Sequence, residues 1–346
     1  MQAFQRKLIY PGHVYMDSTH IKANANKKKV TAEMVMEERR YYQDELEAEI
    51  DQECTKQGFK IPSAVTYDKK TKVSISDPEC GIFNKGEHEV QAAYLAQTVC
   101  DLNGFVLGTK VNPANKHDSS TFQAVYQEVI SRFGVAGEHG IRAIGLDAGY
   151  KTPAIAREII LSGITPLLPY TTPKGKRNNE DDPLQITSKK FVYDSQHDWF
   201  ICPNQCLATP RGISKETGYV VYRTILNRHI WQKFIDEAEL IRMTEYHRRY
   251  YSLRKRTIER VFADAEEKHG LRYTRVKGKQ KVQDETLLVY ACMNLKKMAM
   301  WTDISSSGNF LYSCLICLKN LKTHNSVKKG SYLQLFRRIN AFLSTV

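Results

Sequence analysis

Apolar and polar residues follow three patterns in the first quarter of the chain, and each pattern predicts a different element. A short apolar run at residues 13–16 is followed by Asp17 and further polar residues, which predicts a strand that ends at Asp17. From residue 30 to 56, apolar residues recur at roughly helical spacing among many acids, which predicts an amphipathic, solvent-facing helix. Residues 60–87 are rich in Pro, Gly, Asp and Lys, so we expect a long connection there.

Two strand-like segments at residues 90–100 and 105–111 give the clearest local signal in the sequence. Between them lies the dipeptide Asn103-Gly104. Because Asn-Gly supplies the positive φ angles of a type I′ turn, the sequence predicts an antiparallel hairpin with that turn.

Helical and strand-like segments alternate after the hairpin. Apolar residues fall on one helical face at residues 119–133 and again at 153–163, and a Gly ends each pattern. Buried-type strands are expected at residues 141–146 and 164–168. The order strand, strand, strand, helix, strand, helix, strand predicts a mixed α/β sheet, because its last βαβ units are parallel.

The segment from 171 to 225 has a different character. A polar loop at residues 173–182 comes first, followed by short strand-like pieces. These pieces lie at residues 191–193, 199–201 and 218–222. We therefore expect a β-rich insertion in this part of the chain.

Helical periodicity returns at residues 229–270, with a break near Tyr250, and again at residues 283–300. No clear pattern follows residue 301. The chain is therefore divided into four segments: the first part of a core at 1–170, the insertion at 171–225, the helical completion of the core at 226–301, and a tail at 302–346.

The basic residues are concentrated in one segment. The chain has a formal net charge of +13, and residues 240–281 contribute 13 Lys or Arg against 5 acids, whereas residues 31–56 contribute 3 against 9. Such a polarised excess favours a defined face for nucleic acid. No apolar run approaches the ~18 residues of a membrane span, and no signal-peptide pattern begins the chain. We expect a cytoplasmic, nucleoid-associated protein with no membrane partner.

The eight cysteines indicate a reducing compartment, since no secretory signal accompanies them. Cys202 and Cys206 are separated by three residues, and Cys314 and Cys317 by two. Either spacing can begin a zinc site, but a structural zinc site needs four ligands. Ordinary thiols are the favoured interpretation, and a zinc-binding module around Cys202 and Cys206 is the alternative.

Three acids are candidates for catalysis. Asp17 and Asp147 end predicted buried strands, and Glu259 lies in the basic helical segment. Carboxylates that converge on one point repel each other unless divalent cations neutralise them, and Mg²⁺ binds carboxylates and phosphate oxygens. Two such ions about 4 Å apart can drive in-line phosphodiester displacement. Taken singly, an Asp after a strand is more often a turn residue, and a Glu among Lys and Arg is usually an ion pair.

The residues around these acids resemble the conserved blocks of bacterial insertion-sequence DDE transposases. The three main blocks are YMDSTHIKANANK at 15–27, GLDAGYKTP at 145–153 and TIERVFADA at 257–265, which continues as KHGLRY at 268–273. Shorter matches are DPE at 77–79 with KG at 85–86, HDS at 117–119 and MNLKK at 293–297.

This resemblance implies a ribonuclease-H-like mixed sheet flanked by helices, with the β-rich insertion between the second and third catalytic acids. It implies metal-dependent cleavage and strand transfer at insertion-sequence ends, with two Mg²⁺ ions, for which Mn²⁺ can substitute, held by Asp17, Asp147 and Glu259. The partners it implies are double-stranded DNA and a second copy of the chain in a homodimer. The predicted DNA-binding residues are Tyr251, Arg254, Lys255, Arg256, Lys268 and Arg272.

Two departures from the family pattern favour an alternative. Position 266, usually Lys, is Glu266, and a helical DNA-binding region usually precedes the first Asp, which here is Asp17. The alternative is a degenerate, truncated transposase that binds DNA without catalysing transposition.

Overall fold

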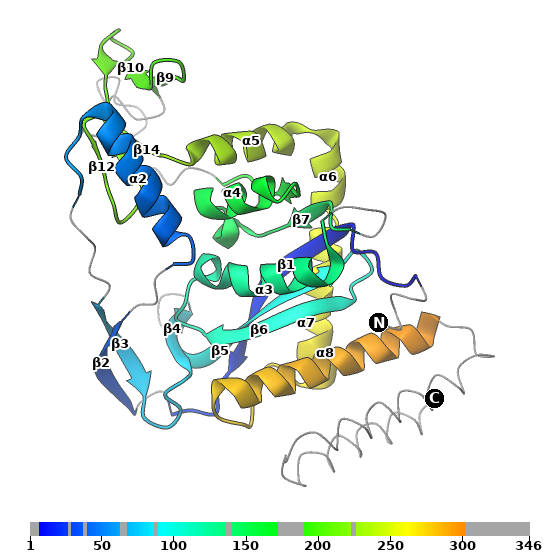
Figure 1. The fold of residues 1–346 in the computed structure, drawn as a ribbon. Coiled ribbons are helices and arrows are strands. Elements are labelled where there is room, and N and C mark those ends of the chain that lie inside the picture. The colour runs from blue at the N-terminus through cyan, green and yellow to red at the C-terminus, as the bar shows by residue number, and fades with distance from the viewer. Residues whose placement is uncertain are drawn as a thin grey trace. The chain divides into compact units, whose positions relative to one another are not determined.

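The chain folds into a mixed sheet with helices on both faces (Figure 1). The computed structural model describes residues 7–26, 29–36, 40–62, 68–85, 89–135, 140–171, 190–222 and 226–301. The expected polar loop at 173–182, the tail at 302–346 and the Cys314–Cys317 pair lie outside these residues. The chain divides into two compact units, Met1–Asn294 and Leu295–Val346.

Six strands form the central sheet. They are β1 (His13–Lys22), β4 (Gly81–Lys85), β5 (Glu89–Asp101), β6 (Val106–Pro113), β7 (Ala143–Gly145) and β8 (Thr165–Leu167). Strand β1 lies between β5, to which it is antiparallel, and β7, to which it is parallel. Strand β8 is parallel to β7, while β4 and β6 pair in succession along the other edge of β5. The mixed sheet expected from the strand and helix order is confirmed.

Helices pack against both faces of the sheet. Strand β5 contacts helices on both faces, because successive side chains along a strand point in opposite directions. Gln97 donates a hydrogen bond to the carbonyl of Asp118 at the start of α3 (Asp118–Phe133), with an N–O distance of 2.8 Å. The next residue, Thr98, contacts the hydroxyl of Tyr290 in α8 (Lys279–Trp301) at 3.2 Å. Together with α4 (Pro153–Leu161), α3 confirms the two helices expected after the hairpin.

Helix α7 (Arg254–His269) buries the apolar stripe that its sequence contains. The buried residues of this stripe are Ile258, Val261, Phe262 and Ala265. They belong to one cluster with Tyr15 and Ile21 of β1 and with Tyr94 and Ala96 of β5. Burial of these side chains fixes which face of α7 looks outward, and Glu259 lies on that exposed face.

Three element predictions in the first quarter of the chain are wrong. Strand β1 continues through Asp17 to Lys22, because it keeps pairing with β5 along its whole length. The segment expected as one helix at 30–56 is a strand, β2 (Val30–Met36), followed by α2 (Gln43–Gln57). The expected connection at 60–87 contains β4 and β3 (Asp68–Ser74), and β3 pairs with β2.

The β5–β6 hairpin is confirmed, but its turn differs from the type I′ prediction. Gly104 has a φ of +75°, whereas Asn103 is not among the described residues with positive φ. The amide of Gly104 donates to the carbonyl of Asp101 at 3.0 Å, and the amide of Asp101 donates to the carbonyl of Phe105 at 3.0 Å. These bonds close a three-residue loop in which only the last position needs a left-handed backbone.

Short strands follow β8, as the sequence predicts for 171–225. One three-stranded sheet holds β9 (Val192–Asp194), β10 (Trp199–Ile201) and β11 (Leu207–Ala208), and another holds β12 (Gly212–Ile213), β13 (Tyr219–Val221) and β14 (Asn227–His229). Two helices, α5 (Gln232–Met243) and α6 (Glu245–Tyr251), then lead to α7. The break expected near Tyr250 lies at Ser252 and Leu253, between α6 and α7.

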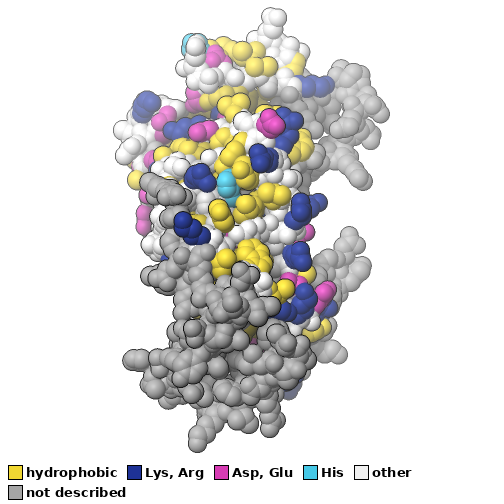
Figure 2. Space-filling model, turned by 90° about the vertical axis from the view of Figure 1, so that its right-hand side faces the viewer, with side chains coloured by type: hydrophobic (Ala, Val, Ile, Leu, Met, Phe, Trp, Pro, Cys, Tyr) yellow, Lys and Arg dark blue, Asp and Glu magenta, His cyan; other side chains and the backbone are white. Residues whose placement is uncertain are grey.

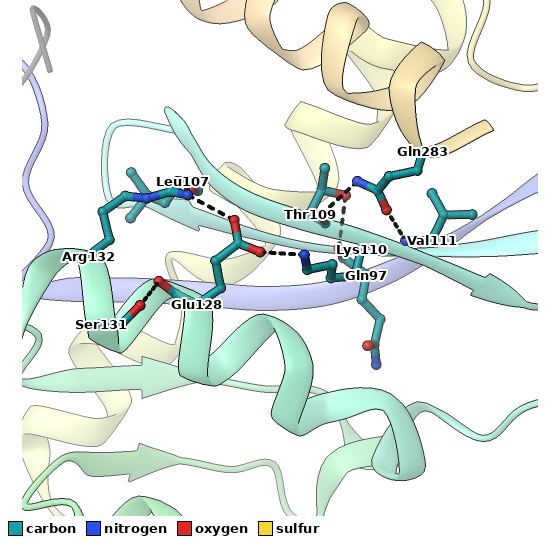
Figure 3. Close-up of polar contacts among 9 residues, drawn as sticks. All are labelled: Gln97, Leu107, Thr109, Lys110, Val111, Glu128, Ser131, Arg132 and Gln283. Atoms are coloured by element: carbon teal, nitrogen blue, oxygen red, sulfur yellow. Dashed lines mark hydrogen bonds and ion pairs between the residues drawn. The ribbon is translucent and has the colours of Figure 1, made fainter. Parts of the chain in front are cut away.

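Helix α8 closes the outer edge of β6 with side-chain amides. The Gln283 side chain accepts from the amide of Val111 at 2.7 Å and donates to the carbonyl of Thr109 at 3.0 Å (Figure 3). Asn294 makes the same two kinds of hydrogen bond with the backbone of Val106, at 2.9 and 2.8 Å. None of the described helices combines the length and apolarity needed to cross a membrane.

Candidate active site

The register of two parallel strands brings Asp17 and Asp147 together. Tyr15 of β1 is paired with Gly145 of β7, and the two acids lie two residues further along their respective chains. Asp17 remains in β1, whereas Asp147 follows the end of β7 and precedes the short 3₁₀ turn at residues 148–150. Neighbouring strands are about 4.8 Å apart, so the register alone places both carboxylates at one point of the sheet.

Helix α7 is attached to β1 at both ends. Before the helix, the Tyr15 hydroxyl donates to the carbonyl of Tyr250 at 2.8 Å. After the helix, the backbone amide of Lys22 donates to the carbonyl of Arg272, and the backbone carbonyl of Lys22 accepts from the amide of Thr274, each at 3.0 Å. The helix rises about 24 Å over its 16 residues and the strand about 23 Å from Tyr15 to Lys22, so their lengths match.

The guanidinium of Arg254 joins the three predicted catalytic acids. It forms a short ion pair with Asp17, lies 3.8 Å from Asp147 Oδ1 and lies 3.4 Å from Glu259 Oε1. The Arg254 side chain is 8% exposed and that of Asp17 is 16% exposed, whereas the other two carboxylates are half exposed. The structure therefore brings together all three acids from β1, the end of β7 and α7, with a cation among them.

Burial and charge act in opposite directions on Asp17. Burial raises the pKa of Asp17 to about 6, and the carboxylates of Asp147 and Asp118 add to this rise. The Arg254 guanidinium and the Ser18 amide, which donates to Asp17 Oδ1 at 2.9 Å, oppose it. Burial also raises the pKa of the Tyr251 hydroxyl, and all three acids contribute to that rise, so Tyr251 belongs to the same site.

Asp118 is a fourth acid beside the site that the sequence interpretation did not include. It begins α3 on the opposite face of the sheet and accepts a hydrogen bond from the Ser18 hydroxyl at 2.7 Å. Ser18 follows Asp17 in β1, so the two acids approach the same strand from its two faces. The HDS block at 117–119 was the available signal, because it resembles a transposase block without having an assigned role.

The predicted DNA-binding residues other than Tyr251 fall into three groups. Lys255 and Arg256 are exposed on the first turn of α7. Lys268 is ion-paired with Asp264 at 2.6 Å, and Arg272 with Glu266 at 3.3 Å. Arg254 is buried among the acids.

Basic side chains also extend beyond the site. Figure 2 views the side on which α6 lies in Figure 1, and Lys and Arg side chains are spread over its described part among hydrophobic ones. A surface of this kind can attract a polyanion from several directions.

The described residues offer limited metal-binding geometry. Within these ranges, no group of three or more Asp, Glu, His or Cys side chains is arranged to hold a metal ion. Cys202 and Cys206 lie at the turn between β10 and β11, where the Cys202 amide donates to the Cys206 carbonyl at 2.8 Å. Cys54, Cys80 and Cys100 are buried.

A comparison with protein families gives a match for the C-terminal part of the described chain. Residues 186–299 match the family described as Transposase DDE domain. The matched segment contains Tyr251, Arg254 and Glu259, whereas Asp17 and Asp147 precede it. Comparisons with curated proteins and with solved structures give no match.

Proposed function

We propose that this chain cuts and joins DNA, because residues 186–299 match the family described as Transposase DDE domain. The proposed reaction is cleavage at insertion-sequence ends followed by transfer of the 3′ end to target DNA. The observation that supports it is the convergence of Asp17, Asp147 and Glu259 on one guanidinium. Groups that surround one cation can also surround another, so these acids are the proposed catalytic set.

The strand order supports a ribonuclease-H-like core. Reading across the sheet, the order is β6, β5, β1, β7 and β8. Strand β5 is antiparallel to both β6 and β1, whereas β1, β7 and β8 are parallel to one another. This is the arrangement that the family resemblance implies. The short strands β9 to β14 lie between Asp147 and Glu259, where an insertion is expected.

The three acids are chemically suited to a hard divalent cation, although in the structure their oxygens face the Arg254 guanidinium. All three groups are carboxylates, and two of them are half exposed, so each can present oxygen atoms to an ion that retains water ligands. We propose that Asp17, Asp147 and Glu259 hold two Mg²⁺ ions, for which Mn²⁺ can substitute. When bound, the ions would activate the attacking water or hydroxyl and stabilise charge on the phosphate.

The remaining residues have positioning roles in this proposal. The Ser18 amide fixes one oxygen of Asp17, and the attachment of α7 to β1 holds Glu259 beside the two aspartates. Lys255 and Arg256, exposed one turn before Glu259, would contact phosphates of double-stranded DNA. Binding both transposon ends and a target would require a homodimer, which we include in the proposal.

One observation favours the alternative of a transposase that binds DNA without catalysing transposition. Glu266 is paired with Arg272, and Asp264 with Lys268, so two of the predicted DNA-binding cations are partly neutralised. Such pairs weaken phosphate binding without affecting the three acids.

The decisive experiment incubates the purified chain with a supercoiled plasmid that carries the DNA flanking its gene. We expect Mg²⁺-dependent nicking and strand transfer, and loss of both in Asp17→Asn, Asp147→Asn and Glu259→Gln. Glu267→Gln is the matched control, since Glu267 is an exposed acid on the same helix, and it should react like the wild type. Binding without cleavage by a folded wild-type sample would favour the alternative, and equal cleavage by all the variants would refute the proposed site.

A further inference from the structure

Arg254 is held in an unusual environment for a buried cation. Its guanidinium contacts Asp17, Asp147 and Glu259, while its Nε is buried without a hydrogen-bond partner. A buried polar group without a hydrogen-bond partner costs free energy. The attraction of the three carboxylates must therefore offset this cost and the desolvation of the cation.

The charges in the site do not balance with Arg254 alone. Three ionised carboxylates carry three negative charges, and one guanidinium neutralises one of them. Asp17 is the most buried of the three acids, so part of the remaining negative charge is shielded from solvent. A divalent ion would balance the excess, but Mg²⁺ needs carboxylate oxygens at about 2.1 Å in near-octahedral geometry.

The guanidinium and a divalent ion would require the same oxygen atoms. The facing atoms are Asp17 Oδ2, Asp147 Oδ1 and Glu259 Oε1, and each is within 4 Å of an Arg254 nitrogen. The other oxygen of Asp17 already accepts the Ser18 amide. Two cations that share these atoms would also lie a few ångströms apart and repel each other strongly in a partly buried site.

We propose that Arg254 is a positioning residue that occupies the place of a divalent cation among the three acids and leaves it when the ion binds. This inference rests on the proposed function, because it assumes that the three acids hold metal. In the metal-free protein, Arg254 keeps the carboxylates assembled. On metal binding, the guanidinium moves out beside the exposed Lys255 and Arg256, where DNA phosphate would receive it.

The position of Arg254 in the chain makes this movement feasible. It is the first residue of α7, directly after the turn at Ser252 and Leu253 that separates α6 from α7. A side chain at a helix start can change its direction without breaking the hydrogen bonds of later turns. Glu259, one and a half turns later, keeps its place because the apolar stripe of α7 remains buried.

The first test measures Mn²⁺ binding in solution, by the loss of the free-ion signal in electron paramagnetic resonance, without DNA. Removing the competing charge in Arg254→Gln should tighten binding at least about tenfold. Arg260→Gln is the matched control, because Arg260 is exposed on the same helix, and its affinity should stay within about twofold of the wild type. Equal or weaker binding by a folded Arg254→Gln protein would overturn the inference.

The second test uses the wild-type chain, so it does not depend on the folding of a variant. Phenylglyoxal modifies accessible guanidinium groups, and mass spectrometry of the digest reports each arginine. Saturation with Ca²⁺ should raise the modification rate of Arg254 several-fold. Arg132, half exposed and ion-paired with Glu128 on α3, should react at the same rate with and without Ca²⁺. An unchanged or slower reaction of Arg254 would contradict its displacement.

Asp17→Asn separates failure of this inference from failure of the proposed function. If Asp17→Asn binds Mn²⁺ as tightly as the wild type, the proposed metal site is wrong, and the inference fails with it. If Asp17→Asn loses Mn²⁺ binding while Arg254→Gln does not gain it, the metal site stands and only the role given to Arg254 fails.

Discussion

Arg254 and Asp17 form an ion pair although 237 residues separate them in the sequence. The pair connects the first residue of α7 to the middle of β1, and it lies beneath the more exposed carboxylates of Asp147 and Glu259. Burial nevertheless keeps the pKa of Asp17 well above its usual value, at about 6. The site is therefore assembled in the absence of metal, but at an electrostatic cost that can be measured.

This electrostatic cost predicts that the unfolding free energies of the wild type and of Asp17→Asn differ by an amount that depends on pH. Between about pH 4 and pH 6 the unfolded chain has released the Asp17 proton while the folded chain still holds it, so wild-type stability falls as the pH rises. Below this window both states are protonated, and above it both are ionised, so the contribution is constant. Relative to the wild type, the unfolding free energy of Asp17→Asn should rise by about 2–3 kcal/mol from the lower to the upper end of this window. Urea denaturation in EDTA from pH 4 to pH 8 measures this.

Glu267→Gln is the control for this measurement, because it removes an exposed acid from the same helix, α7. Its stability should run parallel to that of the wild type over the whole pH range. A parallel curve for Asp17→Asn as well would show that the Asp17 carboxylate titrates as an ordinary exposed one.

Glu266→Lys should strengthen DNA binding. Glu266 accepts a hydrogen bond from the Thr19 hydroxyl at 2.9 Å and pairs with Arg272, so its replacement by Lys adds a cation and releases another. Each new phosphate contact steepens the dependence of log K on log salt by about 0.9, so the slope should increase by one to two. Fluorescence anisotropy with duplex DNA at KCl concentrations from about 50 to about 200 mM measures this slope.

The adjacent Glu267→Lys makes the same change of charge on an exposed residue outside that ion pair. It should change the affinity less than Glu266→Lys does. If both variants strengthen binding equally, the effect comes from net charge and not from the release of Arg272.

Gly145→Ala should disturb the site by displacing the buried Tyr15 ring. A Cβ at Gly145 would lie 2.6 Å from Cδ1 of the fully buried Tyr15, whose hydroxyl holds the carbonyl of Tyr250 before α7. The Tyr15 ring must shift, so we expect a loss of about 1–3 kcal/mol in unfolding free energy and reduced cleavage. Gly212→Ala is the control, because nothing lies within 4 Å of a Cβ there. Wild-type stability in Gly145→Ala would show that the ring relaxes freely.

The sequence predicted the elements whose signals are local. The β5–β6 hairpin and helices α3 and α4 have apolar periodicity together with turn or capping residues, so they could be located. The sequence predicts a helix where the structure has strand β2. Apolar residues do alternate along this strand, at Val30, Ala32, Met34 and Met36, but the acids around them also fit the polar face of a helix. Its partner β3 has the sequence DKKTKVS, which contains no apolar alternation, so only pairing with β2 makes it a strand.

The candidate site shows the same limit. Strand ends, the basic helical segment and the family resemblance all indicated Asp17, Asp147 and Glu259. Their proximity, however, depends on the β1–β7 register and on the attachment of α7, which no local pattern encodes. The family resemblance predicts that Arg254 contacts DNA, but it does not say whether the side chain is buried. Its burial follows from which face of α7 packs on the sheet, and that is a tertiary property.

The side-chain amides of α8 should protect the outer edge of β6 from pairing with another chain. Gln283 and Asn294 are 11 residues apart, a helical rise of about 16.5 Å, which matches the five strand steps from Val106 to Val111 at about 17 Å. The double variant Gln283→Ala/Asn294→Ala should lose about 2–3 kcal/mol of unfolding free energy, since it leaves edge amides and carbonyls without partners. It should also aggregate faster, because an uncovered strand edge can pair with another chain. Urea denaturation and light scattering measure the two effects, and Gln280→Ala, which removes only a contact to Asp284 on the same helix, should show neither. Wild-type behaviour in the double variant would mean that water replaces the two side chains at no cost.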